Sequence, residues 1–327
     1  MKVLVTGATG FVGTALLQRL ASEVGCGVRA CVRNSGALLG PGIERTVVPD
    51  MGPESQWQDA LAGCDVVVHL AARVHVMQEK NADSLAEFRR VNTDGTVNLA
   101  RQAALAGVQR LVFVSSIKVN GEVTAPGCAF KPDDRSDPQD AYAVSKDEAE
   151  IALRELAAAS VGQTGVGMEV VIVRPPLVYG PGVKGNLSSL LRALCGRVPL
   201  PLGAIHNQRS FIALANLVDF LVHCMRHPMA GNQTFLASDG QDLSTTELVQ
   251  RLASALEKPA RLINVSPWLL KLCATAFGKH AEAQRLCGNL QLDISKTRDL
   301  LGWVPPMNID DGLRMTVTGY LDDHRKS

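Results

Sequence analysis

The chain opens with Val3-Leu4-Val5-Thr6-Gly7-Ala8-Thr9-Gly10-Phe11-Val12-Gly13, the stretch that decides the expected fold. Its apolar start is typical of a strand, and a helical pattern follows from Phe11 to about Glu23. Glycine permits a tight turn at the first position, close approach of a phosphate at the second, and close helix packing at the third. The N-terminus of the following helix offers free N–H donors and a partial positive charge. We therefore predict a dinucleotide-binding loop made of Gly7, Thr9, Gly10, Phe11, Val12 and Gly13.

Strand and helix patterns alternate outward from this loop through the first half of the chain. Residues 65–70 have an unbroken apolar centre, which is typical of a strand covered on both faces. This alternation predicts an α/β fold, a doubly wound parallel Rossmann sheet with right-handed crossovers. The expected strands are 28–32, 44–48, 65–70, 110–114 and 168–173, and the expected helices are 56–61, 82–106 and 141–159.

The regular alternation fades after Arg174-Pro175-Pro176. We therefore expect a dinucleotide-binding Rossmann domain over residues 1–182 and a smaller C-terminal α+β substrate lobe, for a nucleotide-sugar, over residues 183–327. The apolar segment 265–277 is expected to be a core-facing helix, with a helix lying on a membrane surface as the alternative. Further helices are expected at 187–194, 216–225, 244–256 and 310–324.

Composition excludes several classes of protein. Lys plus Arg number 33 against 32 for Asp plus Glu, and this balance argues against a nucleic-acid partner. There is no apolar run of about 20 residues and no secretory pattern, so we expect a cytoplasmic protein without an integral membrane segment. The eight cysteines form no C-x-x-C pair, which favours reduced thiols over a metal site or a disulfide framework.

The end of the second strand bears on the choice of cofactor. Residues 28–34 lack the carboxylate that would bind the ribose hydroxyls of NAD. Arg33 can pair with the 2′-phosphate of NADP(H), which is the expected cofactor, with NAD(H) as the alternative. The other interpretation of Arg33 is an ordinary surface residue. Asp50, after the third strand, either contacts the adenine or forms a turn.

Tyr142-Ala143-Val144-Ser145-Lys146 carries the expected chemistry. Residues four apart share a helix face, so the phenol and the ammonium point the same way. A free tyrosine has a pKa of about 10, and a neighbouring lysine is expected to lower the pKa of Tyr142. Ser116 follows the fifth strand and can donate to a carbonyl or alkoxide oxygen while Tyr142 transfers a proton. Lys146 can also hold the nicotinamide ribose.

These motifs, together with residues 69–72, 91–96 and 174–181, resemble the ordered motifs of extended short-chain dehydrogenases, the NAD-dependent epimerase/dehydratase family. The resemblance covers residues 1 to about 182. It implies that Ser116, Tyr142 and Lys146 are catalytic. It also implies that the following residues lie near the cofactor: Leu70, Ala71, Ala72, Asn92, Ser115, Tyr142, Lys146 and Pro175.

The second half resembles sugar-nucleotide epimerases and reductases around residues 208–219 and 293–305. A nucleoside diphosphate needs a fixed cation, for which Arg209 and Arg285 are the candidates, although both can also be surface arginines. Asn186 either contacts the sugar or diphosphate, or caps a helix. His75 either touches the substrate or makes a local hydrogen bond.

Residues 69–76 and 115–122 are most similar to bacterial reductases of UDP-4-keto-6-deoxy-N-acetylhexosamines, which serve lipopolysaccharide and other surface polysaccharides. The resemblance implies NADPH-dependent reduction of a C4 ketone. The pattern departs from 4-epimerases, which usually have an aromatic where Asn120 stands and an acidic residue near Val32.

Three alternatives stay open. They are a UDP-sugar 4-epimerase with tightly bound NAD, a reductase of an unrelated small carbonyl compound, and a non-catalytic dinucleotide sensor. A homodimer is expected through helices 82–106 and 141–159, which otherwise only cover the sheet.

Overall fold

A seven-stranded parallel sheet forms the centre of the computed structural model, which describes residues 1–74, 84–164, 167–276, 278 and 280–325. Its strand order is β3-β2-β1-β4-β5-β6-β9, so the chain starts in the middle and winds outward both ways. This confirms the predicted doubly wound Rossmann sheet. The strands are β1 (Lys2–Thr6), β2 (Gly27–Val32), β3 (Ile43–Val47), β4 (Val66–His69), β5 (Arg110–Val114), β6 (Glu169–Arg174) and β9 (Thr234–Leu236).

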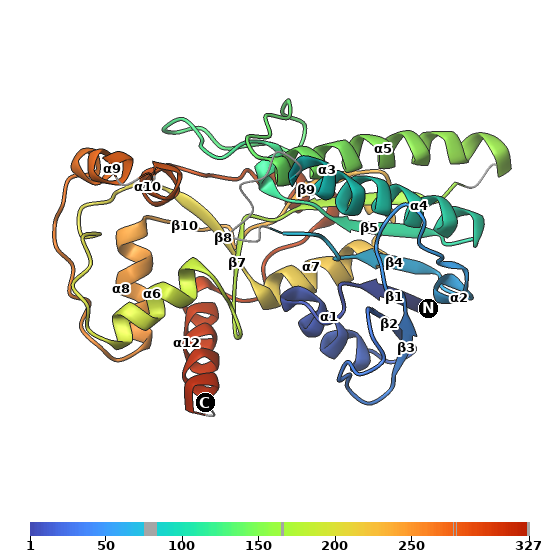
Figure 1. Ribbon diagram of the computed structural model, residues 1–327, viewed down its shortest axis with the longest axis horizontal. Helices are drawn as coiled ribbons and strands as arrows, with labels where there is room; N and C mark the ends of the chain where they lie inside the picture. Colours follow the sequence, from blue (N-terminus) through green and yellow to red (C-terminus); the bar gives the residue numbers. More distant parts are fainter. Residues whose placement is uncertain (75–83, 165–166, 277, 279, 326–327) are drawn as a thin grey trace.

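Helices cover both faces of this sheet. Because successive strand residues point to opposite faces, Val3 and Val5 pack with α1 and α7, whereas Leu4 packs with α2, α4 and α5. Figure 1 shows the two helical layers on either side of the sheet. The chain's low aromatic content leaves these cores largely aliphatic. The covering elements are α1 (Phe11–Ala21), α7 (Leu214–Arg226), α2 (Gln58–Leu61), α3 (Ser84–Phe88), a π-helical segment (Arg89–Asp94), α4 (Gly95–Leu105) and α5 (Ala141–Thr164).

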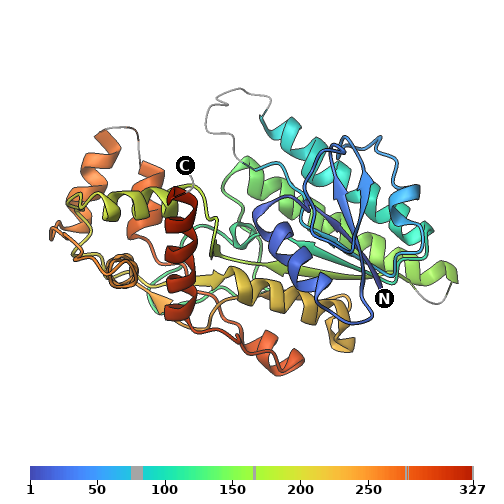
Figure 2. The ribbon, with the colours of Figure 1, turned by 90° about the horizontal axis from the view of Figure 1, so that it is seen from below.

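A second lobe is built around a three-stranded sheet with its own apolar core. Figure 2 shows this lobe beside the lobe that holds the seven-stranded sheet, with α12 near their junction. Helix α7 and strand β9 belong to the first lobe, although they follow residue 182 in the sequence. Residues beyond 182 therefore contribute to both lobes. The elements of the second lobe are β7 (Leu177–Tyr179), β8 (Arg209–Ala213), β10 (Asp242–Leu243), α6 (Asn186–Cys195), α8 (Thr245–Ala255), α9 (Pro267–Ala276), α10 (His280–Cys287) and α12 (Ile309–Arg325). Helix α11 (Ser295–Leu301) packs against β9 in the first lobe.

The expectation of a core-facing helix over residues 265–277 is wrong. Helix α9 has no buried residue, and Trp268 is 69% exposed. Only Leu270 packs against the core of the second lobe. Apolar residues occupy nearly every side of the helix, but only the side with Leu270 contacts the core. Most of its apolar surface is therefore uncovered.

Helices α4 and α5 pack side by side over one face of the sheet, which is the sheet-covering role. Their pairing across a dimer axis stays a prediction. In the part of the chain that the structure describes, no helix combines the length and apolarity needed to cross a bilayer. All eight cysteines are free thiols.

Candidate active site

The glycine loop has the geometry that a pyrophosphate requires. Gly7 has a φ of +65°, and a Cβ there would lie 2.7 Å from the backbone nitrogen of Ala71. A Cβ on Gly13 would lie 2.1 Å from the Gly7 carbonyl oxygen. Helix α1 begins at Phe11, and no side chain caps it and no acidic residue occupies its first turn. Its terminal N–H groups are therefore available to an anion, and Thr9 and Gly10 beside them are exposed.

Residues 70–73 follow β4 as a strip of extended chain that runs beside the glycine loop. The Ala71 N–H donates to Thr6 Oγ1 at 3.2 Å, and Leu70 and Ala72 on either side are half-buried. His69, at the end of β4, bonds Thr6 Oγ1 at 2.7 Å through Nδ1 and Thr96 Oγ1 at 2.9 Å through Nε2. Burial, and then the nearby Lys146, lower the pKa of His69 to about 3. A neutral His69 thus ties two strands and α4 together under the strip.

Asn92 joins the same strip to the catalytic helix. Its Oδ1 accepts from the Arg73 N–H at 2.7 Å, and its Nδ2 donates to the Arg73 carbonyl at 3.0 Å and to Ser145 Oγ at 3.0 Å. Ser145 lies between Tyr142 and Lys146 on α5, and Asn92 is buried in the π-helical segment. Asn92 therefore positions both the strip and α5.

Tyr142 and Lys146 lie on the first turns of α5. The Lys146 ammonium sits 3.9 Å from the centroid of the Phe113 ring, and burial lowers the pKa of Lys146 to about 7, against an opposing effect of Glu150. Burial, and then Asp140, raise the pKa of Tyr142 to about 12. The expectation that Lys146 lowers the pKa of Tyr142 is thus wrong for the chain's own groups. The physical reason is that burial of the phenol, and then the negative charge of Asp140, favour its neutral form.

Two serines follow β5 at the carboxyl edge of the sheet. Ser116 is half-buried and caps the short 3₁₀ turn Ile117–Val119, since its Oγ accepts from the Lys118 N–H at 3.2 Å. Ser115 Oγ is buried and has no hydrogen-bond partner among the described residues. A buried hydroxyl without a partner is unusual, and at this edge a bound ligand would satisfy it. The Pro175 carbonyl accepts from the Ile117 N–H at 3.0 Å, so Pro175 borders the same edge.

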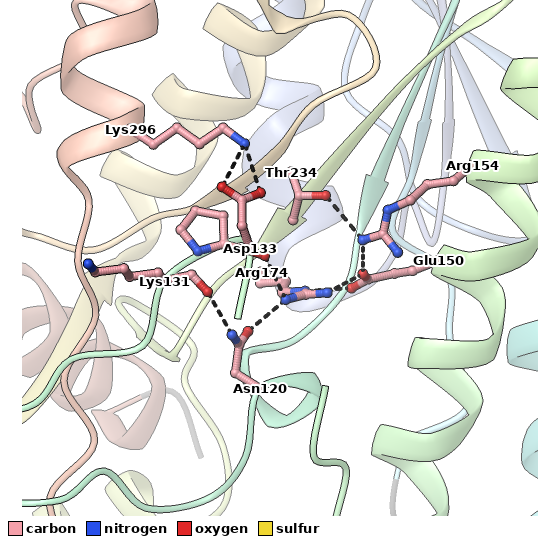
Figure 3. Close-up of polar contacts among 9 residues, drawn as sticks. Asn120, Lys131, Asp133, Glu150, Arg154, Arg174, Thr234 and Lys296 are labelled. Carbon is pink, nitrogen blue, oxygen red and sulfur yellow. Dashed lines mark hydrogen bonds and ion pairs between the residues drawn. The ribbon is translucent and has the colours of Figure 1, made fainter. Parts of the chain in front are cut away.

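A buried ion-pair network anchors α5 to the end of β6 (Figure 3). Glu150, one turn after Lys146, accepts from Arg174 Nε at 2.8 Å and Nη2 at 2.6 Å, and both side chains are at most 2% exposed. Arg174 Nη1 also donates to Asn120 Oδ1 at 2.9 Å. Asn120 Nδ2 donates to the Lys131 carbonyl at 2.9 Å. Asn120 is therefore a structural link between the loop after β5 and the loop that contains Lys131.

Arg209 and Arg285 meet in the second lobe. Arg209, at the start of β8, is half-buried and donates to the Gly288 carbonyl at 3.0 Å. Burial, and then repulsion from Arg285, lower the pKa of Arg209 to about 10. Arg285 pairs with Glu122 at 3.3 Å, and its Nε is buried without a partner among the described residues. The pair carries more positive charge than Glu122 compensates, which suits an anionic group such as a diphosphate.

A series of ion pairs runs from Arg285 to the start of α5. Glu122 accepts from Arg285 and also pairs with Lys118 at 3.0 Å. Lys118 in turn pairs with Asp140, whose Oδ1 accepts from the Ala143 N–H at 2.8 Å. Tyr142 lies two residues after Asp140, so these ion pairs link Arg285 to the turn that carries the phenol.

The remaining predicted site residues are not drawn into this centre. Arg33 is exposed at the end of β2, and Asp50 pairs with Arg90 at 2.8 Å. Asn186 is exposed in the first turn of α6, where Gly185 occupies the cap position, so its interpretation as a helix cap is wrong. His75 lies outside the described residues.

A cavity of about 1060 Å³ lies beside the glycine loop. Thr9, Gly10 and Phe11 line it together with residues of α7 and α12, whereas Tyr142 and Lys146 do not. Tyr142 and Lys146 therefore lie outside this cavity.

Sequence reasoning did not predict a role for Phe113, Glu150 or Glu122. Phe113 supports Lys146 and Glu122 faces the arginine pair. Only Glu150 had a sequence signal, because it lies four residues after Lys146 on the same helix face.

Known proteins resemble the chain over its whole length. It is 46% identical to a UDP-glucose 4-epimerase of Vibrio cholerae, covering 99% of this chain and 97% of that protein. It is 26% identical to the N-acetyl-alpha-D-glucosaminyl-diphospho-ditrans,octacis-undecaprenol 4-epimerase of Escherichia coli O157:H7, covering 96% and 94% of the two chains. MoeE5 in complex with UDP-glucuronic acid and NAD superposes with a TM-score of 0.78 at 25% identity, covering 99% and 100%.

The family model matches residues 3–237, which contain the glycine loop, Ser116, the Tyr142–Lys146 pair and Arg209. The chain belongs to the NAD dependent epimerase/dehydratase family.

Proposed function

We propose that the protein is a UDP-sugar 4-epimerase that works with tightly bound NAD. The observation that carries this proposal is the series of ion pairs from Arg285, whose charge acts on Arg209, through Glu122 and Lys118 to Asp140, directly before α5. These ion pairs would position a diphosphate site near the start of α5, at the sheet edge where the glycine loop would hold the cofactor. The similarity to the Vibrio cholerae epimerase supports the same reaction.

The residues divide the chemistry between them. Bound NAD supplies the hydride acceptor and donor for C4 of the sugar. Tyr142 removes the proton of the C4 hydroxyl and later returns it to the C4 oxygen, so the reaction has no net redox change. Ser116 orients that oxygen through its hydroxyl, and Lys146, held over Phe113, holds the ribose. Arg209 and Arg285 bind the diphosphate.

The cofactor would be held by elements whose geometry fits it. The free N-terminus of α1, the glycines without room for a Cβ and the unpartnered Ser115 hydroxyl are the fitting features. Leu70, Ala71 and Ala72 would border the ribose side of the site.

A second candidate function is NADPH-dependent reduction of the C4 ketone of a UDP-4-keto-6-deoxy-N-acetylhexosamine, giving a UDP-N-acetylquinovosamine-type product. The observation that favours it is the exposed Arg33 at the end of β2, where no carboxylate stands to bind the ribose hydroxyls of NAD. The same Tyr142 would then donate a proton as the hydride arrives.

The test begins with the nucleotide released from purified protein by denaturation. The protein is then incubated with UDP-glucose and UDP-N-acetylglucosamine, and separately with NADPH and the 4-keto sugar. Released NAD together with C4 interconversion supports the epimerase. No interconversion, with one NADPH oxidised per sugar reduced, would establish the reductase instead. Tyr142→Phe should abolish either reaction, whereas Tyr320→Phe, at a buried tyrosine of α12, is the matched control and should retain it.

A further inference from the structure

Helix α9 and the loop before it carry an uncovered apolar surface. Ile263, Trp268, Leu269 and Leu272 are 51%, 69%, 42% and 54% exposed. No other ten-residue stretch of the described chain contains more than two exposed large apolar residues. Trp268 and Leu272 are four residues apart on the helix, so they share one face. Scattered apolar residues are normal on a surface, but a contiguous group of this kind marks a site of contact.

A neighbouring loop extends this surface. The Leu200 N–H donates to the Arg261 carbonyl at 2.9 Å, and the Ile263 N–H donates to the Leu200 carbonyl at 2.8 Å. These bonds pair Leu200 with Leu262 in parallel, and Val198, two residues before Leu200 on this loop, is 50% exposed. Figure 1 shows α9 at the opposite end of the molecule from β1, β2 and β3. We call Arg197, Val198, Arg261, Ile263 and α9 the lobe tip.

The lobe tip is also positively charged, although the whole chain has a net charge of only +1. Its exposed cations Arg197, Arg261 and Lys271 form no ion pair with any described carboxylate.

We propose that the lobe tip docks on the surface of an anionic phospholipid bilayer, with Trp268 and Leu272 inserted among the headgroups. An apolar face with tryptophan and leucine, flanked by uncompensated cations, is the combination that binds such an interface. The ten residues of α9 are too few to span a bilayer, so the helix lies on it. A second copy of the chain is a poor occupant, because a symmetric contact would bring two positive tips together. Anionic headgroups instead neutralise the cations.

Tryptophan fluorescence gives a direct test with the full-length protein. Trp57 and Trp303 are 0% and 3% exposed, so a change in emission on binding a membrane would come from Trp268. With vesicles of phosphatidylcholine and phosphatidylglycerol, we expect a blue shift and co-flotation of the protein. Pure phosphatidylcholine vesicles should give neither, and high salt should reverse both because it screens the cations.

Variants separate the apolar and the charged contributions. The double variant Trp268→Ser with Leu272→Ser should lose co-flotation. Leu105→Ser is the matched control, because Leu105 is 89% exposed at the end of α4, and this variant should float like the wild type. Lys271→Gln and Arg261→Gln should each weaken vesicle affinity about five-fold. Circular dichroism and nucleotide content should match the wild type in every variant.

Three outcomes would overturn the proposal. The first is absence of binding to phosphatidylglycerol vesicles at low salt. The second is equal binding to neutral and anionic vesicles. The third is a blue shift that appears without lipid as protein concentration rises, together with a dimer mass by light scattering that Trp268→Ser abolishes. That result would assign the surface to a second copy of the chain.

Discussion

Glu150 and Glu148 lie two residues apart on α5, and each accepts hydrogen bonds from an arginine, but only one of them is buried. The Glu150–Arg174 pair has side chains that are 0% and 2% exposed, whereas the Glu148–Arg89 pair has side chains that are 31% and 47% exposed. Glu150→Gln leaves the Arg174 charge buried without a counter-charge and turns a donor toward it. Breaking such a buried pair costs about 3–5 kcal/mol of unfolding free energy. Glu148→Gln should cost about 0–1 kcal/mol, because water screens the exposed pair.

Urea denaturation followed by circular dichroism measures the difference. With an m-value of about 3 kcal/mol/M, Glu150→Gln should lower the midpoint by about 1 M or more, and Glu148→Gln by about 0.3 M or less. Equal midpoints for the two variants would refute the reasoning. The double replacement Glu150→Met with Arg174→Met should recover part of the loss, since it removes both buried charges.

Three further predictions concern the site. In the folded protein His69 has a pKa of about 3, whereas in the unfolded chain it has a pKa of about 6.5, so below pH 6.5 the unfolded chain binds more protons. The free energy of unfolding should therefore fall by about 1.4 kcal/mol for each unit that the pH is lowered below 6.5. Denaturation midpoints at pH 7 and pH 5 should show this decrease, and His69→Gln should lack it. Arg209→Met should weaken UDP binding by about 10-fold or more in calorimetry, because a charge-assisted contact is lost, while nucleotide cofactor affinity stays unchanged; unchanged UDP affinity would mean that the diphosphate binds elsewhere. Arg33→Ala should reduce NADPH affinity more than NADH affinity if the exposed guanidinium meets a 2′-phosphate, and equal losses in fluorescence titrations would count against that contact.

Much of the site could be predicted because its signals are local. The glycine loop lies within a strand, a turn and a helix, and the Tyr142–Lys146 spacing depends only on helix geometry. The alternation of strand and helix patterns likewise determined the sheet, since parallel strands need crossover helices. The misjudged helix α9 has the opposite cause. Its apolar composition is the same whether a core or another surface covers it, so composition alone did not determine its burial.

The sequence by itself determined the parallel Rossmann sheet, the glycine turn between β1 and α1, and the shared helix face of Tyr142 and Lys146, because each depends on local residue patterns. Only the tertiary structure decided that β9 completes the sheet, that Arg209 and Arg285 share one site, and that Arg174 pairs with Glu150. It also decided the pKa directions of Tyr142 and Lys146. These properties depend on burial and on contacts between distant segments, which arise only when the packed chain excludes water from the groups it brings together.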